Sequence, residues 1–160
     1  MTLYMNTSFR FIALVLLLCT FSACEKDHSY ADNTPVKITG SQIAGTWQLT
    51  QWYGAPIAGD LYFYITFESK GKTFEIYQNF DTAKARRLTG IYTLEYDEER
   101  GNVLNGIYDH ASGFWNNTYL IGELSPGSMT WSVTDDASDV SIYTRCDAVP
   151  KDILKGTRAQ

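Results

Sequence analysis

Apolar and polar residues alternate with a period of two over most of residues 46–146, the pattern of half-buried β-strands. The clearest examples are residues 61–68 and 73–80, where large apolar side chains occupy every second position. The pattern predicts eight strands, at residues 46–53, 61–68, 73–80, 87–96, 103–108, 114–121, 129–133 and 140–146. Helical periodicity is confined to two short stretches, residues 39–44 and 150–155.

Short turns rich in Gly, Pro, Asp and Ser separate the predicted strands, and they favour hairpins between sequential neighbours. Eight strands joined in this way form an up-and-down antiparallel meander. A flat meander would expose two sheet edges, and closure into a barrel removes both of them. The sequence therefore predicts an all-β fold, an eight-stranded antiparallel up-and-down barrel with short flanking helical turns, over residues 39–160. Such a barrel has room for side chains or for one small ligand.

The first 23 residues are predicted to be a signal peptide rather than part of the fold. Arg10 precedes an apolar run at residues 11–19, which is too short for the roughly 20 residues of a membrane-spanning helix. Its length fits the apolar region of a secretory signal. The following Phe21-Ser22-Ala23-Cys24 resembles the lipobox of bacterial lipoproteins, which implies cleavage before Cys24 and lipidation of its thiol.

Residues 24–38 are predicted to form a flexible polar tether from the lipidated Cys24. Glu25-Lys26-Asp27 resembles the tag that sends lipoproteins of the Bacteroidetes to the cell surface, and an ordinary polar tether is the alternative. The expected location is the cell envelope, lipid-anchored to the outer membrane, with the cell surface as a further option. The membrane is thus one expected partner, through the lipid anchor.

Charge argues against a nucleic-acid partner. Loss of Arg10 with the leader lowers the basic count from 13 to 12 against 18 acidic residues, a net charge of −6. The one basic cluster, residues 84–87, is short and is interpreted as a solvated hairpin end. No nucleic-acid binding is predicted.

Of the three cysteines, Cys19 leaves with the leader and Cys24 takes the lipid, so Cys146 has no partner for a disulfide. Its place at the end of an apolar strand predicts a buried hydrophobic residue, with a reactive thiol as the alternative. Asp81-Thr82-Ala83 resembles the short O-glycosylation motif of exported Bacteroidetes proteins, and a chance match is the alternative.

The sequence predicts no catalytic residues, no metal site and no cofactor. His28 falls in the tether and His110 in a polar turn, and no hydrolase, metalloprotease or phosphate-binding motif is present. The acidic runs at residues 97–99 and 135–136 lack the ligand spacing of a calcium loop. They are interpreted as hairpin turns.

Three short motifs carry a family resemblance: Gly45-Thr46-Trp47 after a helical turn, Thr89-Gly90-Ile91-Tyr92, and Tyr143-Thr144-Arg145. With these motifs the chain resembles the lipocalin-like proteins, and more closely the small lipocalin-like lipoproteins of the Bacteroidetes. The resemblance implies that Trp47 lies at the closed end of the barrel with Arg145 packed over its ring, a cation–π contact.

In the last predicted strand, the residues expected to point inward do not all lie on one face. Tyr143 and Arg145 fall on the opposite face from Val140 and Ile142, so either this strand bulges or the inward face there is the other one.

The supply of aromatic residues, 11 Tyr, 8 Phe and 4 Trp, suits a pocket that orients a ligand. The residues predicted to point inward as ligand-binding candidates are Phe63, Ile65, Phe74, Ile76, Tyr92, Tyr119 and Trp131. The predicted function is therefore a membrane-anchored lipocalin-like binding protein that holds a small apolar or amphipathic ligand in the barrel. The alternative is a filled barrel acting as a structural or protein-interaction domain of the envelope, with Trp52, Tyr62, Tyr64 and Tyr77 exposed on its outer wall for envelope protein partners.

Overall fold

The computed structural model describes residues 36–80, 85–110, 113–156 and 158–159. The predicted signal peptide, Cys24, most of the predicted tether and the Asp81-Thr82-Ala83 motif lie outside the described residues. Within the described ranges, no helix is long and apolar enough to cross a membrane.

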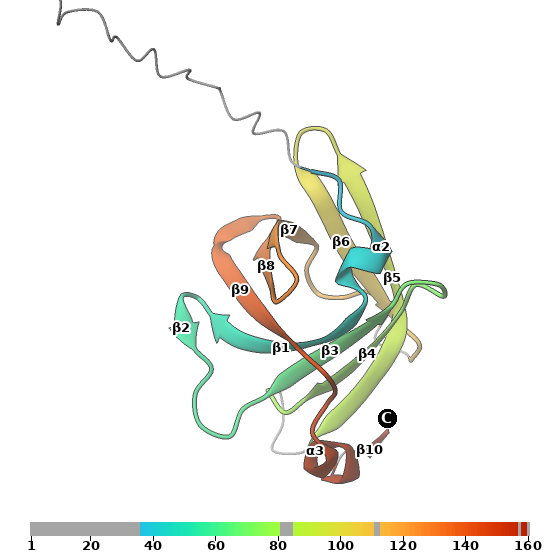
Figure 1. Ribbon diagram of the computed structural model, residues 1–160, viewed down its shortest axis with the longest axis vertical. Helices are drawn as coiled ribbons and strands as arrows, with labels where there is room; N and C mark the ends of the chain where they lie inside the picture. Colours follow the sequence, from blue (N-terminus) through green and yellow to red (C-terminus); the bar gives the residue numbers. More distant parts are fainter. Residues whose placement is uncertain (1–35, 81–84, 111–112, 157, 160) are drawn as a thin grey trace, which may run out of the picture. The chain divides into compact units, whose positions relative to one another are not determined.

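Eight antiparallel strands close into a barrel (Figure 1), which confirms the predicted fold class. They are β1 (Gly45–Trp52), β3 (Phe63–Glu68), β4 (Thr73–Gln78), β5 (Arg86–Asp97), β6 (Gly101–Tyr108), β7 (Tyr119–Leu124), β8 (Ser128–Val133) and β9 (Asp136–Cys146). Each strand pairs with the next in the sequence, and β9 pairs with β1 to complete the ring. Closure leaves none of these strands as a fully free edge.

Four shorter elements flank the barrel: α2 (Gly40–Ile43), β2 (Ala55–Pro56), α3 (Lys151–Gly156) and β10 (Arg158–Ala159). The two helices lie where helical periodicity predicts them. The strand β2 forms a tight hairpin with β1, and β10 adds to β5 in parallel. In the hairpin, Tyr53 and Gly54 both have positive φ, 50° and 73°, as a two-residue turn between twisted strands requires.

The sixth predicted strand is displaced by the structure. Residues 114–121 were expected to be extended, but β7 begins only at Tyr119, and Phe114 forms an isolated bridge to Ile107. Residues 113–115 still pair with β6, because the backbone N–H of Trp115 donates to the carbonyl of Gly106 at 2.8 Å and that of Tyr108 donates to the carbonyl of Gly113 at 2.7 Å. The pairing is broken at residues 116–118, where the segment lines the open end of the barrel with Asn116 and Asn117.

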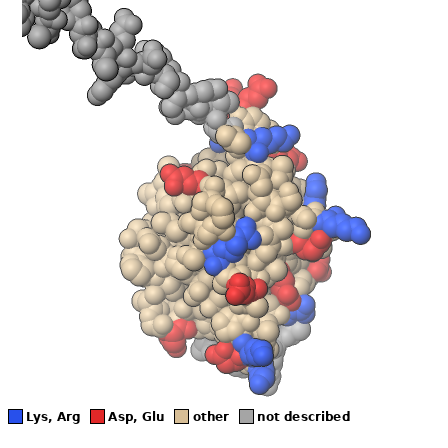
Figure 2. Space-filling model, in the orientation of Figure 1, with Lys and Arg blue, Asp and Glu red and all other residues tan. Residues whose placement is uncertain are grey.

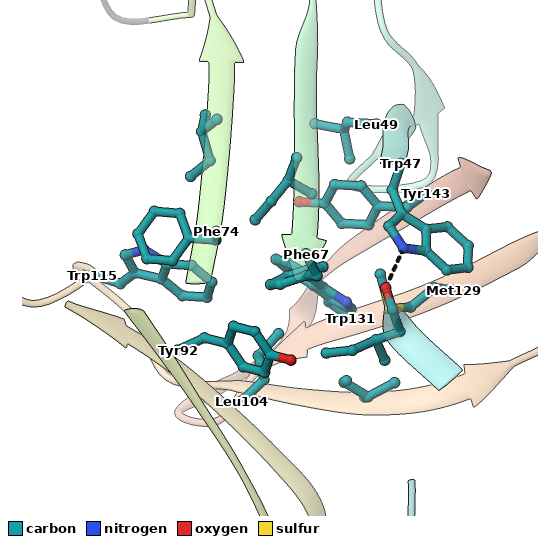
Figure 3. Close-up of a cluster of buried hydrophobic side chains, with 14 of the residues drawn as sticks. Trp47, Leu49, Phe67, Phe74, Tyr92, Leu104, Trp115, Met129, Trp131 and Tyr143 are labelled. Carbon is teal, nitrogen blue, oxygen red and sulfur yellow. Dashed lines mark hydrogen bonds between the residues drawn. The ribbon is translucent and has the colours of Figure 1, made fainter. Parts of the chain in front are cut away.

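One end of the barrel is closed by packed side chains (Figure 3). The most deeply buried of the large residues are Trp47, Phe67, Ile43, Ile65, Leu104 and Met129. The short helix α2 begins with a capping box between Thr39 and Gln42, and its Ile43 carbonyl accepts a hydrogen bond from Trp47 Nε1 at 2.8 Å. The helix therefore fixes the tryptophan ring across this end.

Ordered packing starts before the predicted domain boundary at residue 39. Ile38 is buried, and its N–H donates to Asn102 Oδ1 at 2.7 Å. Asn102, itself buried in β6, donates through Nδ2 to the carbonyl of Val36 at 3.0 Å. The last residues assigned to the tether are thus joined to the barrel by one asparagine.

The outer wall of β3 and β4 is covered by the C-terminal segment. Tyr64 and Tyr77 are buried, and they cluster with Val149, Ile153 and Cys146. Their expected exposure on the outer wall is therefore wrong, because α3 packs over them. Cys146 is partly buried in this cluster, and burial raises the pKa of its thiol.

One face of the surface carries charged residues of both signs. On the face shown in Figure 2, basic and acidic side chains are interspersed. Arg87, from the basic cluster noted in the sequence, forms an ion pair with Glu75. Asp97 caps its own turn by accepting from the N–H groups of Glu99 and Arg100, as a hairpin turn requires.

Candidate ligand-binding cavity

The end of the barrel opposite Trp47 contains a cavity of about 270 Å³ that opens to solvent. It is lined from several strands and from the segment before β7. Its aromatic lining residues are Trp52, Phe63, Phe80, Tyr108, Trp115, Tyr119, Trp131 and Tyr143. The aliphatic lining comes from Leu49, Ile65 and Ile76, and the polar lining from Gln78, Asn116, Asn117, Asp139 and Ser141.

Most of the residues predicted from the sequence as ligand-binding candidates reach this cavity. The five that line it are Phe63, Ile65, Ile76, Tyr119 and Trp131. Phe74 and Tyr92 also point inward, but they lie in the packed core outside the cavity lining. The structure thus divides the predicted inward set between a filled closed end and a hollow open end.

Trp52 lines the cavity because β1 bulges. Leu49 is opposite Tyr143, but Gln51 is opposite Ile142, so Thr50 is an extra residue in the ladder. The extra residue reverses the alternation of faces and turns Trp52 inward. Its predicted place on the outer wall is therefore wrong, although it remains 42% exposed at the mouth of the cavity.

A second irregularity lies between β8 and β9, next to Asp139 at the mouth of the cavity. Val133 is opposite Asp136 whereas the preceding Ser132 is opposite Val140, so three residues of β9 are inserted. Asp139 is partly buried, and its Oδ1 accepts a hydrogen bond from Trp52 Nε1 at 2.7 Å. Ser141 and Tyr143 of β9 also line the cavity. The inward face of this strand is therefore the one that carries Tyr143, and not the one that carries Val140 and Ile142.

The floor of the cavity is a cluster of aromatic rings around Trp131. The ring centroid of Tyr143 lies 4.4 Å from that of Trp131, and those of Tyr119 and Trp115 lie 5.2 Å and 6.1 Å away. Trp131 and Trp115 are close to parallel, at 28°. Such clusters are stabilised by the electrostatics of the rings as well as by burial, and they give the floor a fixed shape.

The two tyrosine hydroxyls on this floor are neutral in the folded protein. Burial raises the pKa of Tyr143 well above 10.0 and also raises the pKa of Tyr119, and the charge of Asp139 adds to both shifts. Both hydroxyls therefore act as neutral hydrogen-bonding groups.

Two indole groups of the lining lack hydrogen-bond partners in the described part of the chain. They are Nε1 of Trp115 and Nε1 of Trp131, both buried. Buried donors are normally satisfied, and an unsatisfied one is unfavourable. A bound molecule with an acceptor group would suit this part of the lining.

The lining has the composition of a small-molecule binding site. Its rigid aromatic floor and few polar groups are features of small-molecule sites. No cluster of three or more His, Cys, Asp or Glu residues that could hold a metal ion occurs within the described residues. His110, stacked on the cavity residue Tyr108 at 5.1 Å, is not itself part of the lining.

The strand pairing and the cavity define a closed antiparallel barrel with one filled and one open end. No protein-family model matches the chain, and no curated protein matches it. Among solved structures, the chain is similar to a lipocalin-like protein from Bacteroides uniformis ATCC 8492, with 20% sequence identity and a TM-score of 0.48. That match covers 66% of this chain and 99% of the other.

Several lining residues were not among the sequence candidates, and they include Trp52, Trp115, Asp139 and Tyr143. Trp52 depends on a bulge, which simple alternation cannot show. Asp139 and Tyr143 follow from alternation once the inward face of the last strand is the one opposite to Val140 and Ile142. The sequence did contain one indication of a buried group near Gly106, because a glycine inside a strand often marks the close approach of another group. In the structure that group is Trp115.

Proposed function

We propose that this protein is a lipocalin-like binding protein that holds one small amphipathic molecule in the open end of its barrel. The observation that carries the proposal is the cavity of about 270 Å³ with its aromatic floor and polar mouth. Apolar walls with a few placed polar groups are the usual composition of a ligand site. The neutral hydroxyls of Tyr119 and Tyr143 supply orientation without an opposing charge.

The cation–π pair supports kinship with lipocalin-like proteins. Arg145 lies over the ring of Trp47 at the closed end, as the family resemblance implies. This end is structural, since the cavity lining includes neither residue. In this proposal, one end of the barrel is closed by packed side chains and the other end holds the ligand.

The alternative function, a filled barrel with an exposed apolar outer wall, has less support. It needs exposed Tyr64 and Tyr77, which are 6% and 8% exposed beneath the C-terminal segment. It also needs a solid interior, and the open end is hollow. We therefore favour ligand binding over a docking role for envelope proteins.

We further propose that the barrel is held at the outer membrane by lipid on Cys24. Support comes from the signal-peptide pattern, the Phe21-Ser22-Ala23-Cys24 motif and the polar residues after it. Two or more acyl chains anchor a protein stably, whereas one binds marginally. Under this proposal the ligand site is carried close to a membrane surface by a short tether.

Native mass spectrometry of the protein isolated from its own cells tests the binding function. The proposal predicts a second charge-state series, heavier than the protein by the mass of a small molecule. The extra mass should be lost under collisional activation, because the complex is non-covalent. Protein that carries no such molecule, and whose melting temperature no small-molecule extract of the same cells raises, would contradict the proposal.

A further inference from the structure

The charged residues of the cavity lining are of one sign. Among the described residues of the lining, Asp139 is the only acidic side chain, and no Lys, Arg or His lines the space. Arg86 lies directly opposite the lining residue Gln78 in the β4–β5 ladder, so it is on the same inward face and its Nε is buried, but it does not line the cavity. Because carboxylic side chains are ionised near neutral pH, the cavity presents a negative charge at its mouth.

The rings below Asp139 favour the same sign of ligand. The faces of aromatic rings carry negative electrostatic potential and attract cations within about 6 Å of the centroid. Trp131 and Tyr143, with centroids 4.4 Å apart, form the centre of the floor, and Trp52 and Phe80 pack edge to face at the mouth. An anion placed here could accept from the buried Nε1 groups of Trp115 and Trp131, but it would also face the Asp139 carboxylate, with no cation in the described lining to offset its desolvation.

We propose that the ligand of this cavity is a small organic cation, an amine or quaternary ammonium on an apolar body, with its charged group beside Asp139. This rests on the proposed function and assigns a chemical class to the same site. The apolar body lies against the floor formed by Trp131 and Tyr143. The ammonium takes the position where the carboxylate and the ring faces both attract it.

The carboxylate is held in place for such a role. Asp139 Oδ1 accepts from Trp52 Nε1 at 2.7 Å, which fixes the group across the mouth from β9 to the end of β1. A carboxylate has two oxygens and several lone pairs, so this bond leaves acceptor capacity for an ammonium group. Because the carboxylate is already oriented, binding loses less side-chain entropy.

The volume of the cavity limits the size of the cation. About 270 Å³ lies just below the ~300–1,000 Å³ of sites that hold drug-sized ligands. A single ring with a short aminoalkyl chain fits this limit better than a long-chain amphiphile does.

Three probes that share a phenyl ring and a two-carbon chain test the charge preference: phenethylamine, 2-phenylethanol and phenylacetate. Each is titrated by isothermal calorimetry into the full chain, isolated from its own cells in detergent and stripped of bound molecules. The proposal predicts that the amine binds at least about tenfold more tightly than the alcohol, a difference of about 1.4 kcal/mol, and that phenylacetate binds most weakly.

Two matched variants locate the preference. Asp139→Asn keeps a carbonyl acceptor for Trp52 and removes the charge, so it should bring the affinity for phenethylamine down to that for the alcohol. Asp135→Asn removes an exposed charge from the same hairpin, outside the cavity lining, and should leave all three affinities unchanged.

The outcomes separate this inference from the binding function on which it rests. Equal or tighter binding of the alcohol or of phenylacetate would overturn the cation assignment and leave a ligand-binding barrel. An amine preference that survives Asp139→Asn would overturn the role of this carboxylate. Failure of all three probes would also overturn the assignment, and the native mass spectrum would then decide the binding function independently.

Discussion

The guanidinium carbon of Arg145 lies 4.0 Å from the ring centroid of Trp47, and the guanidinium also donates to three backbone carbonyls. Nη1 donates to Ala44 at 2.6 Å, Nη2 to Gln42 at 2.9 Å and Nε to Pro126 at 2.7 Å. One side chain at the end of β9 therefore joins the helix α2, the first strand and the turn before β8. This contact closes the barrel at the end away from the ligand cavity.

Removal of either partner should destabilise the barrel without changing the cavity. Trp47→Ala deletes a fully buried indole and should lower the free energy of unfolding by about 3–5 kcal/mol. Arg145→Ala removes the cation–π contact and leaves carbonyls without donors, at a cost of about 1–3 kcal/mol for this partly exposed group. Urea unfolding followed by tryptophan fluorescence measures both. Unchanged midpoints would show that the barrel is closed by other contacts.

Gly106 should be intolerant of even one added methyl group. A Cβ at this position would lie 2.2 Å from Cε2 of Trp115, so Gly106→Ala must displace the indole. We expect a loss of about 1–3 kcal/mol, as overpacked cores show. The matched control is Gly122→Ala in β7, where a Cβ meets nothing within 4 Å and stability should be unchanged or slightly higher. Equal stability of the two variants would contradict the packing of Trp115 on Gly106.

Stability should fall at alkaline pH because of the buried phenol of Tyr143. Burial raises the pKa of this group well above 10.0, whereas the unfolded chain titrates near that value. Above pH 10 the unfolded state therefore binds fewer protons than the folded state, and the free energy of unfolding declines as pH rises. Burial also raises the pKa values of Tyr64, Tyr77, Tyr92 and Tyr119, which adds to the decline.

Urea unfolding at pH 8, 10 and 11 measures this decline. Tyr143→Phe should reduce the loss between pH 8 and pH 11, because phenylalanine has no proton to release. A wild-type stability that stays constant or rises over this range would contradict the burial of these hydroxyls.

Cys146 should react slowly until α3 is undocked. The thiolate is the nucleophile, and burial raises the pKa of this thiol, so little thiolate is present at pH 8. Ile153→Asn places a polar, uncharged group in the cluster that covers the outer wall and should speed alkylation by iodoacetamide, because exposure of the thiol lowers its pKa toward the ordinary value.

The neighbouring Leu154→Asn is the control for this experiment, because Leu154 is 43% exposed and lies outside that cluster. The rates are compared in protein that starts at residue 25, so that Cys146 is the single thiol. Equal rates in the two variants would show that α3 does not protect Cys146.

Much of the barrel follows from alternation, because a period of two directly records which side chains are buried. Seven of the eight predicted strands coincide with observed strands, with ends shifted by a few residues. The exception is the stretch before Tyr119, where pairing with β6 is broken between the Ile107–Phe114 bridge and Tyr119, and the ring of Trp115 packs on Gly106. Packing between distant parts of the chain decides such a case, and a local pattern does not contain it.

The candidate site was harder to predict than the fold for a related reason. Inward faces were correct where the ladders are regular, as at Phe63, Ile65 and Ile76. They failed where an extra residue reverses the alternation, as at Thr50 before Trp52. Tyr64 and Tyr77 are buried because the C-terminal segment packs over them. The alternation of apolar and polar residues in a strand cannot predict this packing.

The account depends on a ligand that occupies the open end, and a variant that fills this space tests it directly. Ser141 is 7% exposed and lines the cavity, so Ser141→Phe should occupy the space with a ring. Ser138→Phe adds the same ring at an exposed position of the same strand, outside the lining. Both proteins and the wild type are isolated from their own cells, with circular dichroism to verify folding.

The decisive measurement is the mass of what each protein carries in a native mass spectrum. We predict the same small-molecule mass on the wild type and on Ser138→Phe, and its loss from folded Ser141→Phe. A bound mass that persists undiminished in folded Ser141→Phe, or a wild type that carries none, would contradict a ligand held in this cavity.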